Sequence, residues 1–574
     1  MKMMFSMQHN SMMQHPYQCL LYCSQSDHNE AGVLVAASGP YIHTFSAQHG
    51  THLSTWPSKQ DFKPSTQKAK GTEAGSEWIE DHSSSHEDSH RPQKRRKLSL
   101  PLDDSGSSAE IVVDGGNANG QNSNLKQASN PPVTKLAGNS TGQYVVAVTG
   151  EDKCLRVFEL SENGCLKPLS ERVMPKRPSA VALTPDDSTI LCADKFGDVY
   201  SLPLLGKTND SAVGNDDDAK KSTRNGEASW HPQQNSFVPA ATSLTVHTKG
   251  NLEALRQQQK ITNPKAEKKS LNFEHQLLLG HVSLLTDVVC VSIDRFMKKP
   301  RNYILSSDRD EHIRVSRGIP QGHVIEGYCL GHTEFISKLC VSPAYPHLLV
   351  SGGGDDYLLL WDWLKGEIRQ KIDLRGPIKY LKEDYRANAA SENFHGEEEA
   401  VAVEESAEVN IAVSNIRTRQ LREAETTKND FIVTCEGIPA IFMFRMDVDA
   451  SMGFIGTVPL EGNVIDFAIL REQGTVVYSM DTFHEPFSTT AVASDLEKQT
   501  RPSIGVTSFG SMFAPPEKNV GPHGKLIASM EQRVKDQPFV MQEAPGKGRS
   551  MRELLYGLES LRKRGGEDNH GGDD

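Results

Sequence analysis

"GHTEFISKLCVSPAYPHLLVSGGGDDYLLLWDW", residues 331–363, is the stretch that decides the fold. It begins with a Gly-His pair, continues through two apolar segments, and ends with an acidic turn and a Trp-Asp pair. This order is typical of one blade of a WD-repeat propeller, which takes about 40–45 residues. We expect His332, Ser351, Asp355 and Trp361 to form a buried network that stabilises the blade, because buried polar groups need hydrogen-bond partners.

One part of this pattern, an acidic turn followed by an alternating strand, occurs three more times along the chain. The other repeats are "TGEDKCLRVFEL" (149–160), "CADKFGDVYSL" (192–202) and "SSDRDEHIRVSR" (306–317). Their acidic turns align at Asp152, Asp194, Asp310 and Asp355. The first two aspartates are 42 residues apart and the last two are 45 apart, which matches the WD-repeat period. The middle gap of 116 residues fits one repeat plus a polar insertion, so the register continues across the interruption.

Short apolar segments rich in Val, Ile and aromatic residues, separated by Gly, Asp, Asn and Pro, indicate an all-β protein. We predict one seven-bladed WD-repeat β-propeller over residues 17–482, because about 300 residues remain once the polar segments are removed. The strands near 17–45 are expected to complete the last blade, near 430–480. Closing the ring in this way would protect the strand edges.

Long polar segments interrupt the predicted propeller and follow it. Three of them have too few apolar residues to build a core and are predicted to be disordered insertions, at about 57–131, 205–269 and 384–409. The tail, 483–574, is predicted to be mostly disordered, with one amphipathic basic helix at about 549–564. This helix ends in three cations that could contact RNA: Arg562, Lys563 and Arg564. The helix could also dock on a partner, and the alternative to both is a surface helix that packs on the propeller or frays in solution.

Composition excludes several classes of protein. The formal net charge of -12 gives no overall basic field, so any nucleic-acid contact needs a local patch or a partner. The sequence has no apolar run of about 18 residues, so we expect no membrane span, and it lacks the apolar run of a signal peptide. The nine cysteines form no zinc pattern, since Cys19 and Cys23 have no second pair. We therefore expect free thiols and no bound metal.

Catalytic motifs are absent from the sequence. It contains no phosphate-binding GxxxxGK[ST] loop, no GxSxG elbow and no HExxH helix. It also has no glycine-rich βα turn that could hold S-adenosylmethionine or a dinucleotide. We therefore predict a protein without catalytic residues or a cofactor of its own.

A compact basic run, "RPQKRRKLS" (91–99), lies inside the first insertion. It resembles a nuclear import signal, which predicts that the protein is located in the nucleus. The four residues that would carry the signal are Lys94, Arg95, Arg96 and Lys97. A loose RNA-binding patch and a solvated charge run are the alternatives.

The stretch "NYILSSDRDEHIRVSRGIPQGHVIEGYCLGHTEFISKLCVSP", from residue 302 to 343, closely resembles the non-catalytic WD-repeat subunit of eukaryotic tRNA (guanine-N7)-methyltransferase. "LLVSGGGDDYLLLWDWLKGE" continues the resemblance, and "MRELLYGLESLRKRGG" is similar to the tail of the fungal members. The resemblance implies a heterodimer with a separate Rossmann-type methyltransferase, which binds S-adenosylmethionine and methylates the guanosine at position 46 of the tRNA variable loop. The WD subunit would stabilise that partner in its active conformation and help hold the tRNA.

One repeat within the resemblance departs from the WD pattern. Ser316 stands where the tryptophan is expected, and Arg314 lies on the same strand. The resemblance implies that a basic residue on this strand faces an acidic residue of the catalytic subunit, and Arg314 is at the matching position. The other residues predicted to bind the partner lie just before this strand: Arg309, Glu311 and His312. From the residues alone, Arg314 could instead be an exposed strand residue paired with Asp310 or Glu311.

Two other function classes stay open at this point. A generic WD-repeat scaffold, such as a ubiquitin-ligase substrate receptor or a chromatin scaffold, would carry the same blades. A propeller hydrolase would need a nucleophile and a base close together, and the sequence shows no such pair.

Overall fold

A computed structural model of the chain gives the fold. The structure describes residues 16–24, 32–57, 131–206, 271–392, 409–508, 522–536 and 551–563, apart from 272, 296–297, 424–425, 471–473 and 495–500. These residues belong to one compact unit, Met1–Pro57 and Asn130–Asp574. The insertions predicted at about 57–131 and 205–269 lie almost entirely outside the described residues.

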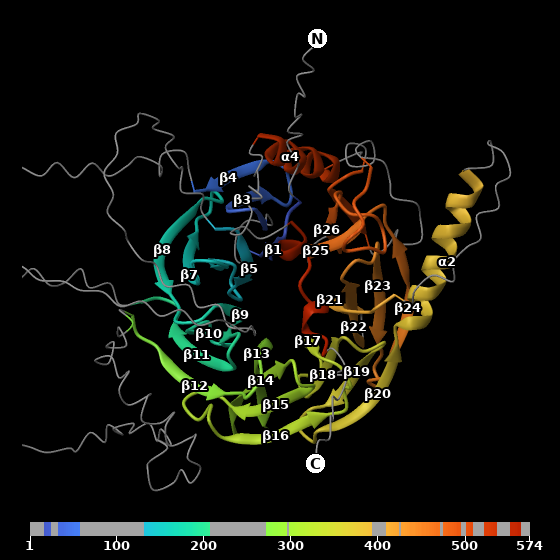
Figure 1. The fold of residues 1–574 in the computed structure, drawn as a ribbon. Coiled ribbons are helices and arrows are strands. Elements are labelled where there is room, and N and C mark those ends of the chain that lie inside the picture. Colours follow the sequence, from blue (N-terminus) through green and yellow to red (C-terminus); the bar gives the residue numbers. More distant parts are fainter. Residues whose placement is uncertain are drawn as a thin grey trace, which may run out of the picture. The chain divides into compact units, whose positions relative to one another are not determined.

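Seven antiparallel sheets, here called blades 1 to 7, follow one another along the chain and form a ring (Figure 1). Blade 1 contains β1 (Cys19–Cys23), β2 (Val33–Ser38), β3 (Tyr41–Ser46) and β4 (His52–Trp56). Blade 2 contains β5 (Val133–Gly138), β6 (Tyr144–Thr149), β7 (Cys154–Leu160) and β8 (Leu166–Val173). Blade 3 contains β9 (Pro178–Leu183), β10 (Thr189–Asp194), β11 (Asp198–Pro203) and β12 (Gln276–Gly280).

The later blades follow the same order. Blade 4 contains β13 (Leu285–Arg295), β14 (Lys298–Asp308), β15 (His312–Arg317) and β16 (Ile325–Leu330). Blade 5 contains β17 (Ile336–Val341), β18 (Leu348–Gly353), β19 (Tyr357–Asp362) and β20 (Glu367–Asp373). Blade 6 contains β21 (Val413–Glu423), β22 (Thr426–Cys435), β23 (Ala440–Met446) and β24 (Met452–Pro459). Blade 7 has three strands, β25 (Asn463–Leu470), β26 (Thr475–Asp481) and β27 (Ile504–Ser508).

The strands form where the sequence has short, β-branched apolar runs. The middle strands are buried on both faces because blades pack face to face, and all six residues of β18 are buried. The outermost strands are mostly polar and exposed because they form the rim of the ring, as in β20, where only Ile372 is buried. The prediction of a seven-bladed propeller with short strands at these positions is confirmed.

The predicted ring closure is wrong. The N-terminal strands do not complete the last blade, because β1 to β4 pair with one another and form a blade of their own. Blade 7 instead ends with β27, which pairs with β26 and extends the propeller beyond residue 482. No strand within the described residues is exchanged between the first and last blades, so the ring must be held shut in another way.

Helix α4 (Pro522–Asp536) covers the junction between blades 1 and 7 (Figure 1). Its apolar residues lie four apart on one face, and all three are buried: Leu526, Met530 and Val534. They pack in one cluster with Phe45 of blade 1 and Ile504 of blade 7. The Tyr17 hydroxyl also donates a hydrogen bond to the Met530 carbonyl, at 2.9 Å. This "closing helix" lies in the tail that the sequence analysis predicted to be mostly disordered.

A second helix, α2 (Arg375–Glu392), connects blades 5 and 6 and packs against β24. It overlaps the start of the insertion predicted at 384–409, so the prediction of disorder is wrong for residues 384–392. Within the described part of the chain, no helix is long and apolar enough to cross a membrane.

The innermost strands carry carboxylates that link neighbouring blades. Asp287 of blade 4 accepts a hydrogen bond from the Leu339 N–H of blade 5, at 3.0 Å. Asp466 of blade 7 accepts one from the Leu20 N–H of blade 1, at 2.7 Å, so it spans the same junction as the closing helix. Lys338 lies among these groups, and burial lowers its pKa to about 8, with a further lowering by Lys135.

Replacing Lys338 with methionine is expected to stabilise the propeller at pH 7 by about 1–2 kcal/mol, because the buried ammonium group disfavours the folded state. The pKa of Lys338 is about 8 in the folded protein and higher in the unfolded chain. The destabilisation caused by its buried charge is therefore fully present below pH 8. It disappears as the pH rises towards about 10.4. Chemical denaturation of both proteins at pH 7 and pH 10 would measure this. Lys167→Met is the control because Lys167 is exposed, and an equal gain for both variants would contradict the argument.

Candidate functional site

Blade 5 contains the network predicted from its sequence. The His332 Nδ1 lies 2.7 Å from an Asp355 carboxylate oxygen, and its Nε2 lies 2.7 Å from the Ser351 hydroxyl. The Trp361 indole N–H donates to the same hydroxyl, at 2.8 Å. Burial raises the pKa of Asp355, but the hydrogen bonds from His332 and Thr333 outweigh burial, so the pKa lies below its ordinary value. All four predicted residues are buried, which fits a structural network.

Blade 4 repeats the network of histidine, serine and aspartate but has no tryptophan. His281 bonds to Asp308 at 2.9 Å and to Ser306 at 2.8 Å. The sequence alignment placed Asp310 at the position of Asp355, but Asp308 at the end of β14 accepts the histidine bond. Asp310 is left partly exposed in the turn. The two acids are only two residues apart, so sequence spacing alone could not distinguish them.

Arg314 takes over part of the role of the missing tryptophan. The Ser316 side chain, at the tryptophan position, accepts a hydrogen bond from Arg314 Nε at 2.8 Å. The two terminal nitrogens of Arg314 donate to the carbonyls of Gly280 and His323, at 3.0 and 3.3 Å. Only 7% of Arg314 is exposed, and burial lowers its pKa. Arg314 is therefore neither an exposed strand residue nor paired with Asp310, and its role in binding a partner stays a prediction.

Replacing Arg314 with lysine is expected to lower the free energy of unfolding by about 1–3 kcal/mol, because an ammonium group cannot reach three separated acceptors. Chemical denaturation would measure the change. Arg317→Lys on the same strand is the matched control. Arg317 forms an exposed ion pair with Glu326, so its replacement should cost less than about 1 kcal/mol. Equal losses in the two variants would contradict the structural role of Arg314.

The outer surface beside Arg314 is apolar. Tyr328 on β16 is the register partner of Arg314. The neighbouring exposed residues Leu330, Leu364 and Ile368 come from blades 4 and 5, and between 43% and 59% of each of the four residues is exposed. The outer edges of blades 4 and 5 meet here, since a Cβ on Gly331, next to Leu330, would lie 2.5 Å from Ile368. We call these four residues the "apolar patch".

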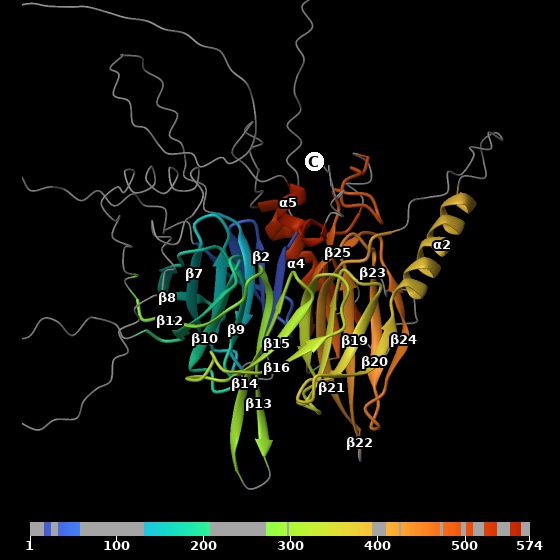
Figure 2. The same ribbon diagram turned by 60° about the horizontal axis from the view of Figure 1, so that its bottom comes forward.

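The C-terminal segment 551–563 crosses one face of the ring and is here called the "strap". It contains α5 (Met551–Leu555) and a single 3-10 turn, η1 (Glu559–Leu561). Figure 2 shows α5 on the face opposite the projecting β13–β14 hairpin. The continuous helix predicted at about 549–564 is wrong. The helix stops because the N–H groups of Gly557, Leu558 and Glu559 bond to the carboxylate of Glu436.

The strap is anchored first on blades 7 and 6. The Tyr556 hydroxyl donates to Asp481 at the end of β26, at 2.6 Å, and His484 bonds to the same carboxylate. Tyr556 is 6% exposed. Glu436, in the turn after β22, receives the Gly557 N–H at 2.6 Å. Burial raises the pKa of Glu436, and the strap N–H groups only partly offset this.

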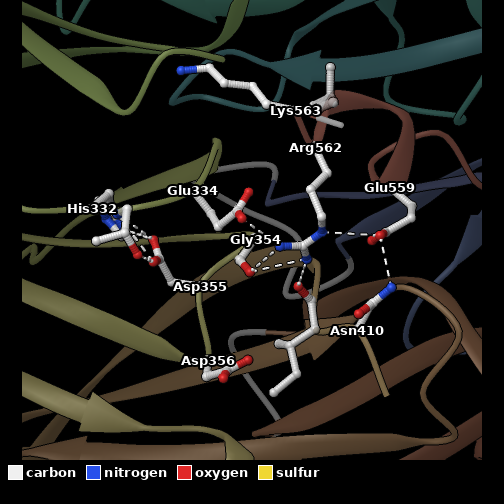
Figure 3. Close-up of polar contacts among 12 residues, drawn as sticks. His332, Glu334, Gly354, Asp355, Asp356, Asn410, Glu559, Arg562 and Lys563 are labelled. Carbon is white, nitrogen blue, oxygen red and sulfur yellow. Dashed lines mark hydrogen bonds and ion pairs between the residues drawn. The ribbon is translucent and has the colours of Figure 1, made fainter. Parts of the chain in front are cut away.

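Arg562 joins the strap to blades 5 and 6 (Figure 3). Its guanidinium donates to the carbonyls of Gly354 and Ile411 at 3.1 Å, and it pairs with Glu334 at 3.2 Å and with Glu559 at 3.0 Å. Four partners around one planar cation fix both the strap and the turn that follows β18.

The strap ends on the turn predicted to bind a partner. Arg309 donates to the Leu561 carbonyl at 2.7 Å. Lys563 pairs with Asp310 at 3.3 Å and with Glu311 at 2.9 Å. The structure thus brings together two groups of residues that the sequence analysis treated separately. His312 is the exception, because it is half exposed and lies near Asp308 instead.

The charges of Arg562 and Lys563 are paired within the chain, which favours an anchoring role over RNA contact. Arg564 lies outside the described residues, as do the four residues of the predicted import signal: Lys94, Arg95, Arg96 and Lys97. Sequence reasoning missed Tyr556, Glu436 and Asp481. The only sequence signal was that Glu436 and Asp481 are acidic residues at the turns of blades 6 and 7, which have no preceding Gly-His pair. Nothing in the sequence indicated Tyr556.

One group of possible metal ligands occurs among the described residues: Asp152, Cys154 and Glu171. Arg156 already pairs with both carboxylates, at 2.9 and 2.5 Å, so the cluster is an ion-pair network. All nine cysteines lie in the described part of the chain and are free thiols.

The sequence matches the family described as "tRNA methyltransferase TRM82 WD40 domain" over residues 34–504. The chain belongs to this family. The matched range runs from β2 of blade 1 to the first residue of β27, so it covers the ring except β1 and most of β27, whereas the closing helix and the strap lie beyond it. The family resemblance stated from the sequence is therefore confirmed.

Members of the family in several fungi are similar to this chain over most of their length. A protein of Aspergillus oryzae named tRNA (guanine-N(7)-)-methyltransferase non-catalytic subunit trm82 is 38% identical over 559 residues, 96% of this chain and 98% of its own. The protein of that name in Coccidioides immitis is 39% identical over 80% of this chain and 82% of its own. The protein of that name in Phaeosphaeria nodorum is 34% identical over 96% of this chain and 99% of its own length.

Proposed function

We propose that this chain is the non-catalytic subunit of a tRNA (guanine-N7)-methyltransferase. The observation that supports this most is the near full-length similarity to relatives named for that role. The subunit is regulatory, so the methyl transfer itself belongs to a catalytic partner. Because the sequence has no glycine-rich βα turn, we propose that the partner binds S-adenosylmethionine.

We further propose that the two subunits form a heterodimer that holds tRNA for methylation of the variable-loop guanosine. The apolar patch supports a docking surface for the catalytic subunit on the outer side of blades 4 and 5. Exposed apolar residues that gather at one place are typical of protein interfaces. Arg314 lies beside Tyr328 of this patch on the adjacent strand, which agrees with the partner contact that the family resemblance implies.

The test is to co-express the chain with the catalytic subunit from the same organism. Methyl transfer from S-adenosylmethionine to tRNA is then measured with each subunit alone and with both. Activity that requires both subunits, from a one-to-one complex, would support the proposal. No complex and no stimulation would overturn it. Cullin adaptors or histones as the main purified partners would favour a generic WD-repeat scaffold.

A variant of the apolar patch locates the interface. Leu330→Asp is expected to abolish the complex without unfolding the protein, because Leu330 is 59% exposed and its replacement desolvates a charge only in the complex. Val173→Asp is the matched control on blade 2, since Val173 is 56% exposed and distant in sequence from the patch. An unchanged complex with Leu330→Asp would place the interface elsewhere.

We also propose that the protein acts in the nucleus, on the basis of the basic run at 91–99. Changing the four import residues to alanine should move a fluorescently tagged chain towards the cytoplasm. An unaltered distribution would show that this run is not the signal.

A further inference from the structure

The acidic turns of the blades are satisfied in two different ways. In blades 4 and 5, a histidine that precedes the blade bonds to Asp308 or Asp355. The segments that precede blades 6 and 7, residues 409–412 and 460–462, contain no histidine. Their turn acids receive hydrogen bonds from the strap instead. In blade 6 the strap supplies the donors to Glu436, and in blade 7 the Tyr556 hydroxyl shares Asp481 with His484, which follows β26 rather than preceding the blade.

The strap visits the blades in spatial order. Tyr556 bonds on blade 7, Gly557 and its neighbours bond on blade 6, and Arg562 bonds between blades 6 and 5. Lys563 then reaches blade 4. Thirteen residues thus cross four blades, and Figure 3 shows the central part of this path around Arg562. A change at one end can affect the other end through a continuous chain of contacts.

The last contact is made with a turn that has an uncommon backbone. Glu311 has a φ of 71°, a left-handed conformation that side chains with a Cβ rarely adopt. Arg309 and Lys563 connect the two sides of this turn to the strap. The turn leads directly into β15, which carries Arg314 beside Tyr328 of the apolar patch.

We propose that the strap is a positioning element for the surface that receives the catalytic subunit: it fixes the turn 308–311 and, through β15, the position of Arg314 and Tyr328. This inference rests on the proposed function, because it names a second determinant of the same complex. The positioning residues are Arg562 and Lys563, which act through the turn and touch no substrate.

The full-length chain provides the first test. Arg562→Gln is expected to weaken the catalytic subunit's affinity about 5–150-fold, the usual range of coupling between two sites. Isothermal titration calorimetry with the purified catalytic subunit measures the affinity, and circular dichroism at the same temperature confirms that the variant is folded. Arg552→Gln is the matched control because Arg552 is an exposed cation on α5, outside the network, and it should bind like the unmodified chain.

A second test asks whether the strap and the catalytic subunit strengthen each other's binding to the propeller. A strap that only stabilised its own surroundings would not show this effect. A chain that ends at residue 550 keeps the closing helix, and a synthetic peptide of residues 551–566 is added to it. The peptide should restore affinity for the catalytic subunit, and the catalytic subunit should tighten peptide binding by the same factor. Hydrogen exchange at residues 308–317 should slow when the peptide binds.

Wild-type affinity for Arg562→Gln and for the shortened chain, with unchanged exchange at 308–317, would overturn the inference while leaving the proposed function intact. Failure of the unmodified full-length chain to bind the catalytic subunit would overturn both. Loss of affinity that the peptide restores, with equal coupling in both directions, would support the positioning role.

Discussion

Replacing Trp361 with alanine is expected to lower the free energy of unfolding by about 3–5 kcal/mol, the usual cost of removing a buried aromatic side chain. The indole is fully buried in a cluster that joins blades 4 and 5, which includes Tyr303 and Leu349. Its N–H is also bonded to Ser351, so the variant removes both packing and a hydrogen bond from the blade 5 network. Chemical denaturation followed by intrinsic fluorescence and circular dichroism would measure the loss.

A phenylalanine at the same position separates these two contributions. Trp361→Phe keeps most of the ring but removes the indole donor, so we expect it to cost less than the alanine variant. Leu364→Ala, three residues later, is the exposed control and should change stability by less than about 0.5 kcal/mol. If Trp361→Ala cost no more than Leu364→Ala, the network would not be a main source of blade stability.

Replacing Met530 with alanine in the closing helix should cost about 2–5 kcal/mol, because its fully buried side chain packs between the first and last blades. The loss should be concentrated at one place in the ring. Hydrogen exchange is therefore expected to rise in β1 and β25, which lie on either side of the junction, more than in blades 3 and 4. Chemical denaturation measures the total loss of stability, and hydrogen exchange shows which strands lose it.

Lys525→Ala on the exposed side of the same helix is the matched control, and it should have little effect. Tyr17→Phe tests the hydrogen bond to the Met530 carbonyl separately, with an expected cost of about 1–2 kcal/mol. A uniform rise in exchange around the whole ring after Met530→Ala would contradict the idea that α4 specifically closes it.

The blades could be predicted from sequence because their signals are local. Alternating apolar residues, Gly-His pairs and acidic turns recur within about 45 residues, and the network of His332, Ser351, Asp355 and Trp361 lies within one repeat. Ring closure could not be predicted in this way. It depends on whether β1 pairs with β2 or with a strand more than 400 residues later, and both choices fit the same alternation.

The strap shows the opposite limit of sequence reasoning. Its leucine spacing favours a helix, yet three of its N–H groups bond to Glu436, more than 120 residues earlier in the chain. A long-range acceptor therefore overrides a local preference. Arg314 is a similar case, because its burial depends on the carbonyls of Gly280 and His323, which no spacing rule locates.

The place of the closing helix in the chain has a consequence for shortened gene products. Every strand among the described residues precedes α4, so a protein that ends between residues 509 and 521 has every blade but leaves the junction of blades 1 and 7 uncovered. A stop codon late in the coding sequence should then be as harmful as one much earlier. A stop after residue 536 should be far milder, because it removes the strap and spares the ring.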